Sequence, residues 1–241
     1  MKRQIPNLIT LCNLLCGVFS CIFAYEETLH IAAMFICLGI FFDFFDGMAA
    51  RLLGVASPLG KELDSLADVV TSGVAPGMIM YVLIAQLTDL SWLKYLALLI
   101  PLFAAYRLAK FNIDTRQSHS FLGLPVPANA LIWVGLALAW RLSCSNECIL
   151  PGDHTAIAIT LVAVSLATNI LMISEVPMFS LKFNFKDMSW ATNSVQYFFL
   201  VGCAAIIAVC FLTNAFWLSL SFIIIWYILL SLITRKHNNA N

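Results

Sequence analysis

The chain has 241 residues, of which 61% are hydrophobic and 11% are charged, and its mean hydropathy is +0.92. This composition is too apolar for a soluble globular domain and indicates a protein that crosses a membrane several times. The formal net charge is zero, so no basic excess points to nucleic acid as a partner. We expect a single all-α membrane domain over residues 1–241, because helices satisfy their own backbone hydrogen bonds in lipid.

The chain begins with basic residues and a long apolar run. A signal peptide starts in the same way, but no small-residue cleavage site follows the run, so we interpret it as the first membrane helix. Since a span needs about 20 apolar residues, the sequence predicts about eight membrane helices. They cover residues 8–25, 30–52, 66–88, 91–111, 126–142, 154–174, 194–212 and 215–233.

Four aspartates lie where the second and third predicted helices meet. Asp43 and Asp46 are three residues apart, and Asp64 and Asp68 are four apart, so each pair shares one helix face. Ionisable groups in membrane helices are costly and by default mark function. The four carboxylates can hold hard divalent ions that leave positions for a substrate diphosphate. They can also serve as a proton or sodium relay in a transporter.

Small residues and two basic residues accompany these aspartates. Gly47, Ala50 and Gly60 leave room for a flat ligand such as a nucleotide base, although small residues also allow close helix packing. Arg51 either contacts a diphosphate or braces the aspartates through a salt bridge. A purely structural alternative is a buried network of the aspartates with Arg51 and Lys61.

The end of the fourth predicted helix carries a second polar group. Arg107 is our candidate for contact with a substrate phosphate or carboxylate, and Lys110 and Asn112 lie beside it. Basic residues at helix ends also serve as membrane anchors, which is equally reasonable for Lys110. After this helix, glycine and prolines predict a stiff, non-helical entry into the next one, at Gly123, Pro125 and Pro127.

Two cysteines, Cys144 and Cys148, lie in a polar loop after the fifth predicted helix. They form a disulfide if this loop faces an oxidising compartment, and two free thiols are an equally good interpretation.

The basic residues predict the orientation of the chain. With both termini in the cytoplasm, Lys94 and Arg141 alone lie on the outer side, and the remaining 11 of the 13 basic residues lie inside. The cytoplasmic residues are Lys2, Arg3, Arg51, Lys61, Arg107, Lys110, Arg116, Lys182, Lys186, Arg235 and Lys236. The four aspartates then lie at the cytoplasmic side.

The spacing of these residues resembles a known family signature. The pattern D-x2-D-G-x2-A-R-x8-G-x3-D-x3-D of the CDP-alcohol phosphotransferases is complete here, from Asp43 to Asp68. The segments IPNLITLCNLLCG, ELDSLADVVTSGVAP, YRLAKFN, FLGLPVPAN and LMISEVPMFSLK are similar to the membrane-integral phosphatidylserine synthases of this family. The likeness extends from the N-terminus to about residue 182.

The resemblance implies transfer of a phosphatidyl group from CDP-diacylglycerol to L-serine, with CMP as the leaving group. It implies that Asp43, Asp46 and Asp64 bind divalent metal, Mg²⁺ or Mn²⁺, and we expect two ions. Asp68 would join this metal site and act as the base on the serine hydroxyl. The resemblance further implies a nucleotide pocket formed by Gly47, Ala50, Arg51 and Gly60.

Several points stay open at the sequence level. Glycerol 3-phosphate or an inositol phosphate is an alternative acceptor, although these would require more basic residues than the site offers. The serine ammonium has three candidate partners, Glu62, Asp114 and Glu175, which are equally reasonable as solvated loop charges. The resemblance also implies a homodimer in the inner membrane, with membrane lipid around it and the active site facing the cytoplasm.

Overall fold

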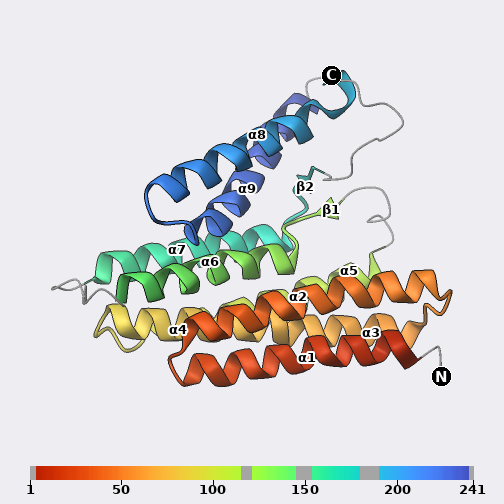
Figure 1. Cartoon of the computed structure of the whole chain (residues 1–241), viewed down its shortest axis with the longest axis horizontal. Coiled ribbons are helices and arrows are strands. Elements are labelled where there is room, and N and C mark those ends of the chain that lie inside the picture. Colours follow the sequence, from red (N-terminus) through yellow and green to blue (C-terminus); the bar gives the residue numbers. More distant parts are fainter. Residues whose placement is uncertain (1–3, 115–120, 145–153, 180–189, 239–241) are drawn as a thin grey trace.

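The computed structural model describes residues 4–114, 121–144, 154–179 and 190–238. Within these residues, six helices are long and apolar enough to cross a membrane, and two shorter apolar helices accompany them. The predicted all-α membrane bundle is confirmed, and the chain is an integral membrane protein (Figure 1). The elements in order are α1 (Gln4–Tyr25), α2 (Leu29–Leu52), α3 (Pro58–Asp68), η1 (Val69–Val74), α4 (Ala75–Leu87), η2 (Leu93–Leu98), α5 (Leu99–Ile113), β1 (Phe121–Leu122), α6 (Val126–Cys144), α7 (Thr155–Ile173), β2 (Pro177–Met178), α8 (Trp190–Leu212) and α9 (Leu218–Asn238).

The third membrane helix differs from its prediction at its start. It runs without interruption from Pro58 to Leu87 as α3, η1 and α4, eight residues earlier than the predicted start at residue 66. Ser57 caps it, since its Oγ accepts a hydrogen bond from the Gly60 N–H at 3.1 Å, and Pro58 suits the first helical position. The first turns are polar, so a hydropathy pattern alone misses them.

The segment η1 is a π-helix that begins directly after Asp68. Such wide turns are rare and occur frequently at functional sites. The hydroxyl of Thr71 in η1 donates to the backbone oxygen of Asn13 in α1 at 2.9 Å. Gly17 of α1 and Gly39 of α2 both face Thr71 so closely that a Cβ at either position would clash with it. Small residues thus bring α1, α2 and η1 into close contact beside the aspartates.

The entry into α6 is only partly as predicted. Gly123 has a positive φ of 75°, and its N–H donates to Val176 O at 2.8 Å, next to the antiparallel pair of β1 and β2. The non-helical prediction is right for Gly123 and Pro125. It is wrong for Pro127, because α6 begins at Val126 and the first turn of a helix tolerates proline.

The last two helices form a separate layer that crosses the others at an angle (Figure 1). This layer is attached through α9, which packs against α6. Ser221 Oγ donates to Ile132 O at 2.7 Å, and the Tyr227 hydroxyl donates to Phe179 O at 3.1 Å.

The N-terminal end of α1, the turn from α2 to α3 and the C-terminal end of α5 lie at one end of the bundle (Figure 1). This is the end for which the basic residues predict the cytoplasm, and the side itself stays a prediction. The predicted partner of Cys144, Cys148, lies outside the described residues, as do Lys2, Arg3, Arg116, Lys182 and Lys186.

Candidate active site

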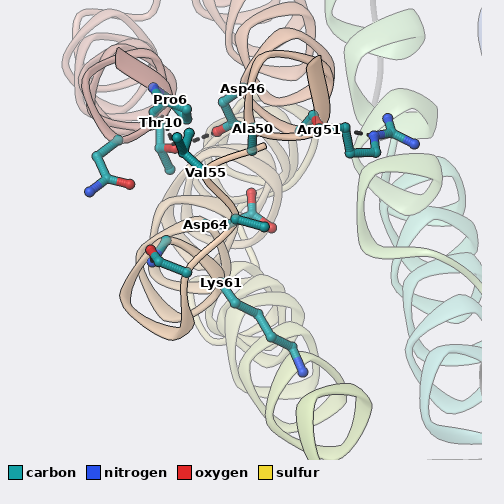
Figure 2. Close-up of a pocket in the computed structure, with 13 residues that line it drawn as sticks. Pro6, Thr10, Asp46, Ala50, Arg51, Val55, Lys61 and Asp64 are labelled. Atoms are coloured by element: carbon teal, nitrogen blue, oxygen red, sulfur yellow. Dashed lines mark hydrogen bonds between the residues drawn. The ribbon is translucent and has the colours of Figure 1, made fainter. Parts of the chain in front are cut away.

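Three of the four aspartates meet in the structure. Asp43 of α2 and Asp64 and Asp68 of α3 each present a carboxylate oxygen, and these oxygens lie within 4.8 Å of one another. Asp46 is buried one turn further along α2, where its Oδ2 accepts a hydrogen bond of 2.5 Å from the Thr10 hydroxyl (Figure 2). The two pairs read from the sequence therefore form one cluster of three carboxylates with the fourth held beside it.

The donor set of this cluster fits a hard divalent cation. Oδ1 of Asp64 is buried and has no hydrogen-bond partner among the described residues. None of the four carboxylates forms a salt bridge within the described part of the chain. Several buried carboxylates without a cation are electrostatically unfavourable, and oxygen ligands of this kind suit Mg²⁺ or Mn²⁺.

Two polar residues of α1 support the aspartates, and the sequence interpretation missed both. Besides Thr10 beside Asp46, the fully buried Asn13 donates from Nδ2 to Asp68 Oδ1 at 3.3 Å. A signal was available in the sequence, since Asn7, Thr10 and Asn13 follow one another at intervals of three in an otherwise apolar helix. That spacing places them on one helix face.

A cavity of about 250 Å³ adjoins the aspartates (Figure 2). All four residues predicted to bind a nucleotide line it, together with two of the aspartates and residues of α1. Its lining includes Pro6, Asn7, Thr10, Asp46, Gly47, Ala50, Arg51, Gly60, Lys61 and Asp64.

The two signature glycines play different roles in this cavity. A Cβ at Gly47 would meet nothing within 4 Å, so this glycine leaves open space and does not serve close helix packing. A Cβ at Gly60 would lie 3.2 Å from Asn7 Oδ1, so Gly60 allows α3 to approach α1.

The two basic residues near the aspartates do not pair with them. Arg51 Nε donates to Gly47 O at 3.0 Å, and its guanidinium points away from Asp46 and Asp64 (Figure 2). Lys61 Nζ donates to Asn112 O at 3.0 Å. Both side chains are exposed, so among the described residues the buried network with Arg51 and Lys61 is wrong, and so is the salt-bridge role of Arg51.

The predicted substrate residues of α5 have three different environments. Arg107 is 7% exposed, lies over the ring of Phe111 at 5.5 Å and interacts electrostatically with Asp68. Lys110 pairs with Glu175 at 3.3 Å. Asn112 Nδ2 donates to Ser65 Oγ at 2.9 Å and thereby links α5 to α3. Of these three residues, Arg107 is the one with an electrostatic interaction with the aspartate cluster, through Asp68.

Comparisons with known proteins agree with this arrangement. The chain is 41% identical over 140 residues to the CDP-diacylglycerol–serine O-phosphatidyltransferase of Bacillus subtilis, covering 58% of this chain and 78% of that protein. It is 34% identical over 181 residues to the protein of the same name from Mycobacterium leprae, covering 72% of this chain and 57% of that protein. It is also 33% identical over 130 residues to the archaetidylserine synthase of Methanothermobacter thermautotrophicus, covering 53% of this chain and 54% of that protein.

The chain thus spans little more than half the length of the last two relatives. The family model for CDP-alcohol phosphatidyltransferases matches residues 3–174, which include all four aspartates, the cavity and Arg107. From this match over more than half of its length, the chain belongs to the CDP-alcohol phosphatidyltransferase family.

Proposed function

We propose that this protein transfers the phosphatidyl group of CDP-diacylglycerol to the hydroxyl of L-serine and releases CMP. The observation that carries the proposal is the cluster of Asp43, Asp64 and Asp68 beside a cavity lined by Gly47, Ala50 and Gly60. The names of the relatives from Bacillus subtilis and Mycobacterium leprae support serine as the acceptor.

In the proposed reaction, Asp68 takes the proton of the serine hydroxyl. The serine oxygen forms a bond to the β-phosphorus, which bears diacylglycerol, and the bond from that phosphorus to the CMP oxygen breaks. Asn13 orients the Asp68 carboxylate, because its Nδ2 donates a hydrogen bond to Asp68 Oδ1. The remaining residues contribute by positioning the two substrates.

The metal site of this proposal consists of Asp43, Asp46, Asp64 and Asp68, and it takes two divalent ions, Mg²⁺ or Mn²⁺. When bound, these ions neutralise the charge of the diphosphate. Thr10 keeps Asp46 oriented toward this site, and the buried Oδ1 of Asp64 is available as a ligand.

The cavity takes the nucleotide in this proposal. The open space at Gly47 and the small side chain of Ala50 admit the cytidine base, and Gly60 forms the opposite wall. Arg51 reaches the diphosphate by leaving its hydrogen bond to the Gly47 oxygen, since its side chain is exposed. We prefer Arg107 to Lys110 and Asn112 as the substrate contact, because Lys110 already pairs with Glu175 and Asn112 already donates to Ser65.

We further propose that the chain is one domain, lies in the inner membrane and has its active site toward the cytoplasm. The hydrogen bonds of Ser221 and Tyr227 support a single domain, since they attach α9 to the preceding helices. The resemblance to the family also implies a homodimer, which a mass measurement of the purified protein in detergent would test.

The test of this function is phosphatidyl transfer by the purified protein. CDP-diacylglycerol is supplied with radiolabelled serine, glycerol 3-phosphate or inositol phosphate, with and without Mg²⁺ or Mn²⁺. We expect metal-dependent transfer to serine alone. In Asp68→Asn the transfer rate should fall by roughly 1,000-fold or more, because this variant lacks both the catalytic base and a metal ligand. Transfer to another acceptor would overturn the choice of serine, and no transfer to any acceptor by folded protein would favour a transporter.

A further inference from the structure

Three buried polar side chains lie on helices that pack beside the aspartates, and of these only Arg107 was predicted to contact a substrate. Ser72 of η1 and Asn129 of α6 are fully buried, and Arg107 of α5 is 7% exposed. Ser72 Oγ, Arg107 Nε and both polar atoms of the Asn129 amide lack hydrogen-bond partners among the described residues. Buried polar atoms are nearly always paired in folded proteins, because leaving them unpaired is costly. These groups therefore point to a polar ligand.

The three side chains come from helices that pack against one another at one end of the bundle. The segments η1, α5 and α6 are in mutual contact. Gly73 faces Ala104, since a Cβ at Gly73 would lie 3.1 Å from the Ala104 Cβ. Arg107 is one turn beyond Ala104 in the direction of Asp68, and Ser72 is one turn beyond Asp68 on the neighbouring helix. Asn129 is in the first turns of α6, which begins at the end of the bundle where α5 ends (Figure 1).

The chemistry of this set fits the polar part of an amino acid. A guanidinium forms two parallel hydrogen bonds with a carboxylate, and one guanidinium balances one negative charge. An amide and a hydroxyl both donate and accept, so Asn129 and Ser72 suit the remaining polar atoms. A phosphate monoester carries more charge than Arg107 alone can balance, and Lys110 is already paired with Glu175.

We propose that Ser72, Arg107 and Asn129 form the acceptor subsite, in which Arg107 binds the carboxylate of the amino acid and thereby selects it over acceptors without one. This inference rests on the proposed transfer to serine. It orients the acceptor with its carboxylate on α5 and its hydroxyl toward Asp68. Arg107 also lines a small cavity of about 10 Å³ together with Lys110, Asp114 and Glu175.

The experiment compares L-serine with ethanolamine, which keeps the hydroxyl and the ammonium group and lacks the carboxylate. For the natural protein we expect kcat/KM for serine to exceed that for ethanolamine by roughly 10- to 100-fold, the usual worth of a charged hydrogen bond. In Arg107→Met this preference falls to roughly 1–3-fold, through a higher KM for serine and an unchanged KM for CDP-diacylglycerol. Arg107→Lys restores part of the preference.

The neutral members of the subsite have a different expected effect. Ser72→Ala and Asn129→Ala should raise the KM for both acceptors by roughly 3- to 10-fold, the usual worth of one neutral hydrogen bond, and leave the preference for serine intact. Ser231→Ala is the matched control, because this buried serine donates within its own helix to Tyr227 O at 2.8 Å. Lys94→Met, at the opposite end of the bundle, is the control for loss of a basic residue.

The outcomes separate this inference from the proposed function. A natural protein that transfers to neither serine nor ethanolamine, but to another acceptor, overturns the proposed function. Serine transfer with full preference for serine in Arg107→Met overturns only the subsite. If Arg107→Met does not fold, two other measurements decide. Equal kcat/KM for serine and ethanolamine in the natural protein overturns the subsite. A raised KM for serine in Arg107→Lys, with the preference for serine retained, supports it.

Discussion

At the scale of single residues, the aspartates depend on polar partners from a helix that is far away in the sequence. Thr10 binds Asp46, and Asn13 binds Asp68, across 36 and 55 residues of chain. Both partners are buried, so these hydrogen bonds form in a medium of low dielectric constant and fix the direction of each carboxylate. We therefore assign α1 a positioning role in the site, in addition to its role as a membrane span.

Replacement of Thr10 by Val tests this role. Valine keeps the shape of threonine and removes the hydrogen bond to Asp46, which is worth about 1.5–3 kcal/mol for a charged acceptor. We expect kcat/KM for CDP-diacylglycerol to fall by roughly 10-fold or more, and the Mg²⁺ or Mn²⁺ concentration for half-maximal activity to rise. A metal titration of activity measures both effects.

The matched control is Thr160→Val in α7. Its hydroxyl is exposed and donates only to Ala156 O of its own helix at 2.8 Å. Activity and metal requirement should stay unchanged there. Equal metal titrations for Thr10→Val and the natural protein would show that Asp46 needs no support from α1.

At the scale of elements, α2 carries two glycines that serve opposite purposes. A side chain at Gly39 would clash with the methyl group of Thr71 and come within 2.9 Å of Asn13 Oδ1, whereas Gly47 faces open space in the cavity. One glycine therefore serves helix packing, and the other leaves room for a ligand.

The substitutions Gly39→Ala and Gly47→Ala should separate stability from activity. Overpacking at Gly39 should destabilise the fold by about 1–3 kcal/mol. Alanine at Gly47 should stabilise α2 by up to about 1 kcal/mol, because glycine is a poor helix former, while its methyl group enters the nucleotide cavity and lowers activity. Thermal unfolding in detergent and transfer assays on the same samples give the two quantities. A Gly47→Ala protein with full activity would argue against a nucleotide in this cavity.

The elements also show where sequence reasoning was sufficient. The apolar lengths predicted α2 to within one residue at its start, because the bilayer requires one continuous apolar run. The same pattern missed the polar first turns of the third span, which a Ser57 cap and Pro58 stabilise, and it contained no signal for the π-helical turn after Asp68. That turn accompanies the close approach of Thr71 to Gly17 and Gly39, which only the packed helices define.

At the scale of the whole molecule, the predicted orientation places the site at the cytoplasmic face. The turn from α2 to α3 and the N-terminal end of α1 lie at the same end of the bundle (Figure 1), and Arg51, Lys61 and Lys110 belong to the helix ends that meet there. Cytoplasmic segments of membrane proteins carry an excess of lysine and arginine. CDP-diacylglycerol and serine would then reach the site from the same compartment.

Cysteine labelling in intact cells tests this orientation. In a cysteine-free background, Glu26→Cys in the turn after α1 should react with a membrane-impermeant maleimide, and Glu62→Cys in α3 should react only after the cells are opened. Both positions are exposed, so accessibility within the protein is comparable. The reverse labelling pattern would place the aspartates outside and contradict the cytoplasmic site.

The sequence by itself determined the membrane class, the apolar parts of the spans and the four aspartates, because apolar run lengths and helical spacing are local properties that the bilayer and the backbone impose. Only the tertiary structure decided that Asp43, Asp64 and Asp68 meet while Thr10 holds Asp46, and that Arg51 turns away from them. It also buried Ser72 and Asn129 with no hydrogen-bond partner for these side chains among the residues that the structure describes. These outcomes depend on side-chain packing between helices that are distant in the sequence, and no local pattern encodes such contacts.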